Sequence, residues 1–240
     1  MRRKTMIIYP AIDLIDGKAV RLEKGDYAKK TEYSSEPAEV AKAFADAGAR
    51  YIHIVDLDGA KAKRPVNLEA IKAIAKAVRV PLQVGGGIRN LESAESLLEY
   101  AERIIIGTVA ITEPETLQEM LEKFGPDRIV VSIDYKDGKP AINGWLEEVE
   151  LTTEALQTRL KGLGIRVGIV TDTALDGLMG GPNTSMMKQW KKAGFEVICA
   201  GGVSSKENIK ELNAAGIDGA IIGKALYEGN ISLREALDAC

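Results

Sequence analysis

Eight short apolar runs rich in β-branched residues recur along this chain of 240 residues. They span residues 6–13, 50–57, 80–86, 103–108, 128–134, 167–172, 196–202 and 219–224. The runs are continuously apolar rather than alternating, which is typical of parallel strands that are covered on both faces. The chain is therefore expected to form an α/β protein built on a parallel sheet.

Amphipathic stretches of helical period lie between most of these runs. Examples are residues 37–49, 67–78, 90–101, 115–125, 153–164 and 205–216. Several end in Gly, a helix stop signal, and Ser or Asn often stands at the start. Eight strand-and-helix units in 240 residues match the length and order of a closed (β/α)8 barrel, which we predict as a single domain over residues 1–240. An open doubly wound sheet is the alternative.

The two halves of the chain resemble each other. Asp13 corresponds to Asp134, VGGGIR to CAGGVS and IIIGT to AIIGK, at offsets of 121, 115 and 116 residues, where half the chain is 120. Three landmarks in the same order at nearly this spacing predict duplicated half-barrels, at approximately 1–122 and 123–240.

Two carboxylates stand at equivalent places in these halves. Asp13 closes the first apolar run and Asp134 closes the fifth. Active sites of such barrels lie at the C-terminal ends of the strands, so the two carboxylates are expected to face each other across the mouth. A lone aspartate at a strand end often only caps a loop or helix. The symmetric pair instead favours a site with the substrate between them.

Glycines follow the strands on both sides of this expected mouth. Backbone N–H groups at glycine turns and helix N-termini bind anions. A single Gly-Gly turn is weak evidence and is more often only a tight loop, but two equivalent pairs suggest a ligand with a phosphate at each end. The candidate phosphate-binding residues are Gly85, Gly86, Gly87, Gly107 and Thr108 on one side and Gly201, Gly202, Gly223 and Lys224 on the other.

Composition excludes several classes of protein. The net charge of −3 gives no basic surplus for nucleic acid, and no apolar stretch approaches the length of a membrane helix. The basic N-terminus lacks the apolar core of a signal peptide. Cys199 and Cys240 are most simply reduced thiols, and the single histidine, His53, excludes a multi-histidine metal centre. We expect a cytoplasmic monomer that binds a small molecule and uses no metal.

The motifs together are specific. PAIDL with DGKAVRL, IHIVDLDGA, VGGGIR, the GW of INGWLE, TD followed by DG and GPN, AGGVS and IIGKAL occur in this order. Over almost the whole chain, they resemble the isomerase of histidine biosynthesis. That family converts the aldose ProFAR, a phosphoribosyl formimino-aminoimidazole carboxamide ribotide, into the ketose PRFAR. The resemblance implies an aldose–ketose isomerase, an intramolecular oxidoreductase, and an Amadori rearrangement of a substrate with two phosphates.

This chemistry needs one acid and one base, and no cofactor. The acid protonates the ribose ring oxygen, and the base then removes the proton from C2. By similarity to the family, Asp13 is the base and Asp134 the acid. The resemblance also implies that the pKa of the Asp134 carboxyl is raised by desolvation or nearby negative charge, while Asp13 stays ionised.

The resemblance assigns supporting roles to five further residues. His53 taken alone is most simply a core histidine, but its match to IHIVDLDG favours a site role. Thr171 is expected to hydrogen-bond the acid and Asp176 to orient the substrate, with loop capping as the alternative. Arg21 and Trp145 match loop positions that fold over substrate in related enzymes, although a Trp beside Gly is often a packing anchor.

One loop departs from the family pattern. The family usually has Asp-Gly-Thr preceded by a basic residue, whereas this chain has Leu175, Asp176, Gly177 and Leu178. Three other readings compete with the isomerase. The homologous cyclase favours Cys-Leu-Asp at the first strand, a bifunctional isomerase carries Arg where this chain has Asn143, and a silent bisphosphate-binding barrel would need neither aspartate.

Overall fold

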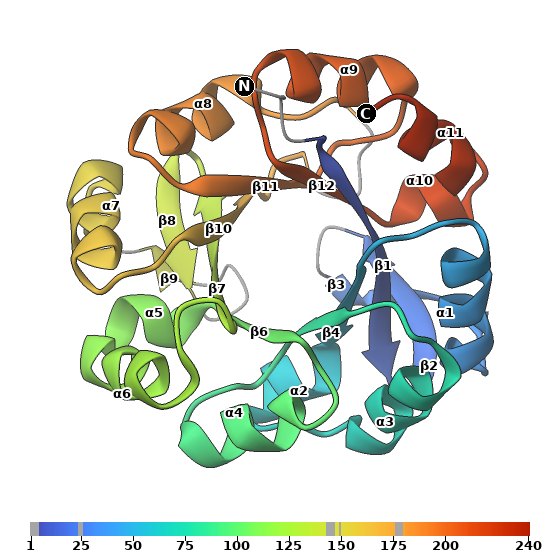
Figure 1. Ribbon diagram of the computed structural model, residues 1–240, viewed down its shortest axis with the longest axis horizontal. Coiled ribbons are helices and arrows are strands. Elements are labelled where there is room, and N and C mark those ends of the chain that lie inside the picture. Colours follow the sequence, from blue (N-terminus) through green and yellow to red (C-terminus); the bar gives the residue numbers. More distant parts are fainter. Residues whose placement is uncertain (1–4, 24–25, 143–146, 149, 176–179) are drawn as a thin grey trace.

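Eight parallel strands close into a barrel in the computed structural model, which describes residues 5–23, 26–142, 147–148, 150–175 and 180–240 (Figure 1). The ring runs through β1 (Ile7–Ile15), β4 (Ile52–Asp56), β5 (Leu82–Gly85), β6 (Arg103–Ile106), β7 (Ile129–Lys136), β10 (Val167–Asp172), β11 (Glu196–Ala200) and β12 (Gly219–Ile222). Parallel pairing of β12 with β1 closes it, from Ile7 opposite Gly219 to Pro10 opposite Ile222. The predicted (β/α)8 barrel is confirmed, and the open sheet is excluded.

Helices surround the barrel (Figure 1). The longer ones are α1 (Pro37–Asp46), α3 (Leu68–Ala77), α4 (Leu91–Leu98), α6 (Pro114–Phe124), α7 (Thr153–Gly162), α8 (Thr184–Lys192) and α9 (Lys206–Ala214). Three short helices, α2 (Leu57–Ala62), α5 (Thr108–Thr112) and α10 (Lys224–Tyr227), begin directly after a barrel strand or one residue beyond it, and the short helix α11 (Leu233–Asp238) follows α10. Side-chain caps begin several helices, such as Asn90 for α4 and Ser205 for α9, as the Ser and Asn signals predicted.

Two apolar regions hold the fold together. The larger one lies between the strands and the surrounding helices, where Trp190 is fully buried and donates a hydrogen bond of 3.0 Å to the hydroxyl of Tyr135. A smaller cluster of barrel-strand residues includes Tyr9, Ile105 and Ile169. It fills the barrel with side chains, so reaction chemistry has room only at the ends of the strands.

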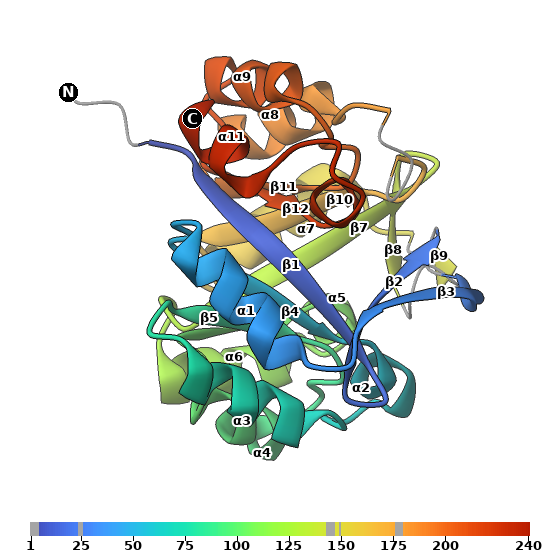
Figure 2. The ribbon, with the colours of Figure 1, turned by 90° about the vertical axis from the view of Figure 1, so that its right-hand side faces the viewer.

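Two hairpins extend the barrel strands at one end of the barrel (Figure 2). β2 (Lys18–Glu23) and β3 (Asp26–Ser34) follow β1, while β8 (Lys139–Ile142) and β9 (Glu147–Glu148) follow β7. Each begins at an Asp-Gly turn with positive φ at both residues, 52° and 74° at Asp16-Gly17 and 50° and 80° at Asp137-Gly138. These hairpins were not predicted, although Asp-Gly is a strong hairpin signal.

The same extension after β1 and β7 supports the predicted duplication, because these are the first and fifth strands of the ring. The half-barrel boundaries themselves stay a prediction. Within the described ranges, no helix has the length and apolar character needed to cross a bilayer.

Candidate active site

Asp13 lies near the C-terminal end of β1 and is nearly buried. Strand β2 folds back antiparallel to β1 and pairs Asp13 with Val20, so the next residue, Arg21, returns to the same strand end. The guanidinium of Arg21 forms an ion pair with the Asp13 carboxylate, and both side chains are largely shielded from solvent. The structure thus brings together two predicted site residues. The hairpin that connects them is the element that sequence reasoning missed.

The same guanidinium lies against Gly223. A Cβ at Gly223 would overlap the Nη2 atom of Arg21, so only glycine leaves room for this arrangement. Gly223 precedes α10, whose first residue, Lys224, pairs with Glu228 at 3.6 Å. Strand β12 therefore meets β1 and its hairpin at a point that carries a carboxylate, a guanidinium and a glycine turn.

Asp134 lies on β7, the fifth strand of the ring and four strands from β1 in either direction. Figure 1 shows β1 and β7 on opposite sides of the barrel. The hydroxyl of Ser132 donates to the Asp134 carboxylate at 3.4 Å, and the register partner of Asp134 on β10 is Thr171. The predicted acid and the predicted partner, Thr171, are thus neighbours on adjacent strands.

His53 lies on β4 opposite Ala11 of β1 and Gln83 of β5. The Nδ1 atom of the His53 ring lies 2.9 Å from Nε2 of Gln83. The buried ring therefore has a polar partner. Burial, with smaller contributions from the positive charges of Arg21 and Arg103, lowers the pKa of His53 to about 3. The ring is therefore neutral at ordinary pH.

The glycines that are predicted to bind phosphate have two different environments. Gly107 and Gly223 precede the short helices α5 and α10, which begin at Thr108 and Lys224, and share one backbone geometry, with φ/ψ of −98°/−101° and −116°/−91°. Gly86 and Gly202 instead allow close backbone contacts. A Cβ at Gly86 would overlap the carbonyl of Asp56, and one at Gly202 would overlap that of Gly181.

These close contacts are a structural reason for glycine at positions 86 and 202, and sequence analysis did not foresee them. Gly87 is similar, since a Cβ there would overlap the carbonyl of Gly59 and the backbone of Arg64. Positive φ values of 112°, 76° and 78° at Gly86, Gly87 and Gly202 also favour glycine. Anion binding by these turns stays a prediction.

Buried Asp56 organises the segment that contacts these glycines. Its carboxylate accepts hydrogen bonds from the backbone of Gly59, Val66 and Asn67 and from the Asn67 side chain, at 2.7 to 3.0 Å. The Asn67 side chain in turn accepts from the backbone of Gly17 at 2.7 Å. This network fixes the turn that carries Arg21 toward Asp13, and sequence analysis did not single it out.

Asp176 and Trp145 lie outside the described residues. The start of the Asp176 loop is described, because Leu175 donates its backbone N–H to the carbonyl of Asp172. The Asp172 carboxylate also accepts from the Asn183 side chain at 2.8 Å, which connects the two ends of this loop.

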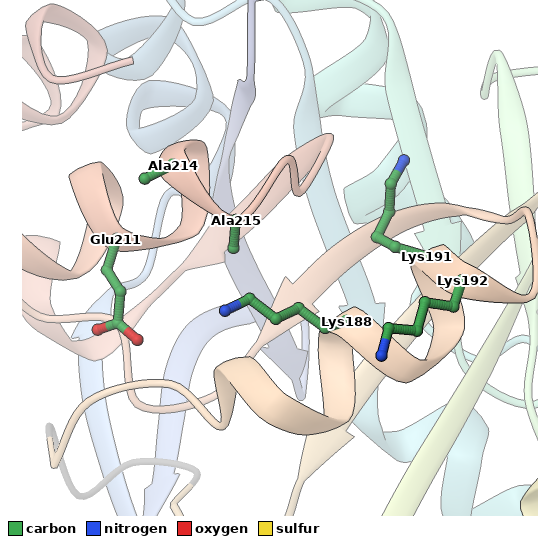
Figure 3. Close-up of a pocket in the computed structure, with 6 residues that line it drawn as sticks. All are labelled: Lys188, Lys191, Lys192, Glu211, Ala214 and Ala215. Atoms are coloured by element: carbon green, nitrogen blue, oxygen red, sulfur yellow. The ribbon is translucent and has the colours of Figure 1, made fainter.

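A surface hollow of about 450 Å³ lies between α8 and α9, away from the candidate site (Figure 3). Lys188, Lys191 and Lys192 line it from α8, and Glu211 lines it from α9; of the three lysines, Lys188 extends toward α9. Lys191 already pairs with Asp218 at 2.7 Å, and the Thr184 hydroxyl contacts Glu211. None of the predicted site residues that the structure describes lines this hollow, so it is not part of the candidate active site as described.

The fold and these strand-end groups define the class: a (β/α)8-barrel enzyme with carboxylates on opposite strands of its mouth. Residues 7–232 match the family described as histidine biosynthesis protein. The chain belongs to this family.

Curated relatives cover nearly the whole chain. A protein of Syntrophomonas wolfei subsp. wolfei is 49% identical over 237 residues, which is 97% of each chain. One from Shouchella clausii is 47% identical over 96% of each chain, and one from Moorella thermoacetica is 44% identical over 97% of each. All three are named 1-(5-phosphoribosyl)-5-((5-phosphoribosylamino)methylideneamino)imidazole-4-carboxamide isomerase.

Proposed function

We propose that this protein is a ProFAR isomerase of histidine biosynthesis, which converts the aldose ProFAR into the ketose PRFAR. Family membership and the names of relatives at 44–49% identity support this proposal. The structural observation that carries it is the placement of Asp13 and Asp134 on strands β1 and β7, four strands apart in the ring. A substrate lying across the mouth would meet one carboxylate on each side.

Asp134 acts first, as the acid. It gives its proton to the ribose ring oxygen, and the bond from C1 to that oxygen breaks, which leaves a positively charged imine. Thr171 hydrogen-bonds this carboxyl group; its register pairing with Asp134 across β10 and β7 supports this role. The protonation of Asp134 in the free enzyme stays a prediction.

Asp13 acts second, as the base. It removes the proton from C2, and the electron pair of that bond forms the enolamine while the imine nitrogen becomes neutral. The enolamine then gains a proton at C1 and loses one from the C2 hydroxyl to form the ketone. General acid or base action contributes on the order of 10²- to 10⁴-fold per group. Orientation through phosphate binding must supply much of the rest.

The two phosphates of the substrate bind on opposite sides of the mouth. One side is formed by Gly86, Gly87, Gly107 and Thr108, and the other by Gly202, Gly223 and Lys224. Arg21 supports the second side, because its guanidinium lies against Gly223 and adds positive charge there.

The remaining expectations belong to the same proposal. Asp176 and Trp145 orient or cover the substrate, and His53 contacts it. The enzyme acts on this small bisphosphate as a cytoplasmic monomer, without nucleic acid and without a cofactor, because proton transfers alone complete the reaction.

The test is an absorbance assay of the purified protein with ProFAR, coupled to the glutaminase–cyclase complex that consumes PRFAR. Turnover of ProFAR is the expected result. Processing of PRFAR without turnover of ProFAR would assign the cyclase reaction instead. Tight binding of PRFAR with neither reaction would identify a catalytically silent barrel.

A further inference from the structure

Three polar side chains from neighbouring strands form a row inside the barrel. His53 on β4 pairs in register with Gln83 on β5, and Gln83 pairs with Arg103 on β6. Gln83 is fully buried, and its amide contacts both neighbours. Buried polar groups cost free energy unless they are hydrogen-bonded, so this row beside the apolar barrel cluster of Tyr9 and Ile105 needs a reason.

Arg103 fixes the orientation of the Gln83 amide. Its Nε and Nη2 atoms lie 3.0 and 2.7 Å from Oε1 of Gln83. Arginine has only donors, so the amide oxygen must face Arg103 and the amide NH₂ must face His53. Arg103 is itself held by the Tyr9 hydroxyl at 2.9 Å and by the Tyr51 ring, whose centroid is 4.8 Å from the guanidinium carbon.

Gln83 in turn fixes the tautomer of His53. Its Nε2 atom carries only hydrogens and lies 2.9 Å from Nδ1 of the ring, so Nδ1 must accept. The proton of the neutral ring is then on its Nε2 atom. The charged groups that act on the ring, Arg21 and Arg103, are both positive and together with burial disfavour the imidazolium form.

We infer that Gln83 and Arg103 are positioning residues that hold His53 as a neutral Nε2–H donor to an oxygen of the substrate. This inference rests on the proposed function for its substrate. Such a ring cannot take up the C2 proton, because Nδ1 is occupied by Gln83 and Nε2 already carries a hydrogen. Asp13, two residues beyond the register partner of His53 on β1, therefore remains the base.

His53 is the only histidine in the chain, so isotope-labelled histidine gives a single imidazole signal by nuclear magnetic resonance. The substrate-free parent should show the Nε2–H tautomer throughout the range from about pH 5 to pH 8. Gln83→Glu places an acceptor opposite Nδ1 and keeps a partner for Arg103, so the proton should move to Nδ1. With ProFAR, kcat should fall by about 10-fold or more, and KM should change less.

Further variants separate positioning from simple stability. Gln83→Met removes the constraint on the ring, while Gln157→Met removes another buried amide, on α7, whose Nε2 atom has no partner among the described residues. Only Gln83→Met should change the tautomer and kcat. Arg103→Met should release the Gln83 amide, and Arg103→Lys should restore the parent tautomer, because lysine still donates to Oε1.

A parent spectrum with the proton on Nδ1 would overturn the inference. So would a switched tautomer in Gln83→Glu with a parental kcat. If Gln83→Glu fails to fold, the same spectrum and kcat are measured for Arg103→Met and Arg103→Lys. A parental tautomer together with a parental kcat in Arg103→Met would then overturn the inference. Lack of ProFAR turnover by the parent would instead refute the proposed function and leave the tautomer result standing.

Discussion

The guanidinium of Arg21 fills the space that a side chain at Gly223 would need. The same guanidinium pairs with Asp13, so the ends of β1 and β12 are linked through one side chain. Glycine at this position has a steric purpose in addition to its predicted role in phosphate binding. The two purposes can be separated experimentally, because Gly107 shares the backbone geometry of Gly223 but has no described residue within 4 Å of the place where its Cβ would lie.

Gly223→Ala should therefore displace Arg21 from Asp13 and lower kcat/KM for ProFAR. In an Arg21→Ala background, Gly223→Ala should reduce kcat/KM by a smaller factor. Expressed as activation free energy, the two effects should differ by at least about 1 kcal/mol, which is the coupling energy between the two positions. The matched change Gly107→Ala should have an effect that is independent of Arg21. Equal effects of Gly223→Ala in both backgrounds would show that the guanidinium does not depend on this glycine. The measurement is steady-state kinetics of the full cycle of variants.

Gly86→Ala should destabilise the fold, because its Cβ would overlap the Asp56 carbonyl. Gly216→Ala is the control, since Gly216 also has a positive φ but no part of the described chain lies within 4 Å of the place that a Cβ would take. Both changes put a side chain on left-handed backbone, at a cost of about 1 to 2 kcal/mol. Gly86→Ala should lose about 1 to 3 kcal/mol more through steric overlap. Urea denaturation measures both, and equal losses would contradict the close contact.

The barrel strands could be predicted because each is a continuous apolar run, as in residues 128–134, and the strand order follows from the alternation with helices. The hairpins could not be predicted from apolar runs, since residues 26–34 are mostly polar. Their Asp-Gly turns were a readable signal that went unused. A second hairpin signal 121 residues after the first would also have strengthened the predicted duplication.

The contacts within the site needed the structure for a different reason. Gln83 and Arg103 are 20 residues apart, and only the register between β5 and β6 makes them partners. Likewise, the contact of Gly86 with Asp56 depends on how the segment after β4 folds back on itself. Single polar residues within apolar runs mark such positions, but the sequence does not say what they contact.

His53 should make stability depend on acid pH. Its pKa is lowered to about 3 in the folded state from the usual 6.5, so the unfolded chain binds the proton first. The resulting stability is fully present above about pH 6.5 and is lost as the pH falls toward 3. Relative to His53→Gln, the parent should lose about 1.4 kcal/mol of unfolding free energy per pH unit in this range. The unfolding free energy of both proteins is measured by denaturation at each pH. If the two curves of unfolding free energy against pH are parallel, the ring is not buried in its neutral form.

Asp13→Asn removes the proposed base while leaving the proposed phosphate sites in place. Turnover of ProFAR should fall by at least about 100-fold, and affinity for a product analogue should change much less. Asp16→Asn is a matched control, because Asp16 is exposed and asparagine tolerates its φ of 52°. Near-parent turnover in Asp13→Asn would make this carboxylate a structural partner of Arg21 only. An equal loss of affinity and rate would make it a binding group.

Asp134→Asn removes the proposed proton donor to the ring oxygen. Turnover of ProFAR should again fall by at least about 100-fold, whereas an analogue whose ribose is already open should react with a much smaller loss. The reason is that ring opening is the step that uses this proton, and the open analogue bypasses it. Asp127→Asn, an exposed change just before the same strand, should leave both reactions unaffected. Single-turnover kinetics with both substrates measure the difference, and equal losses on the two would assign Asp134 a role after ring opening.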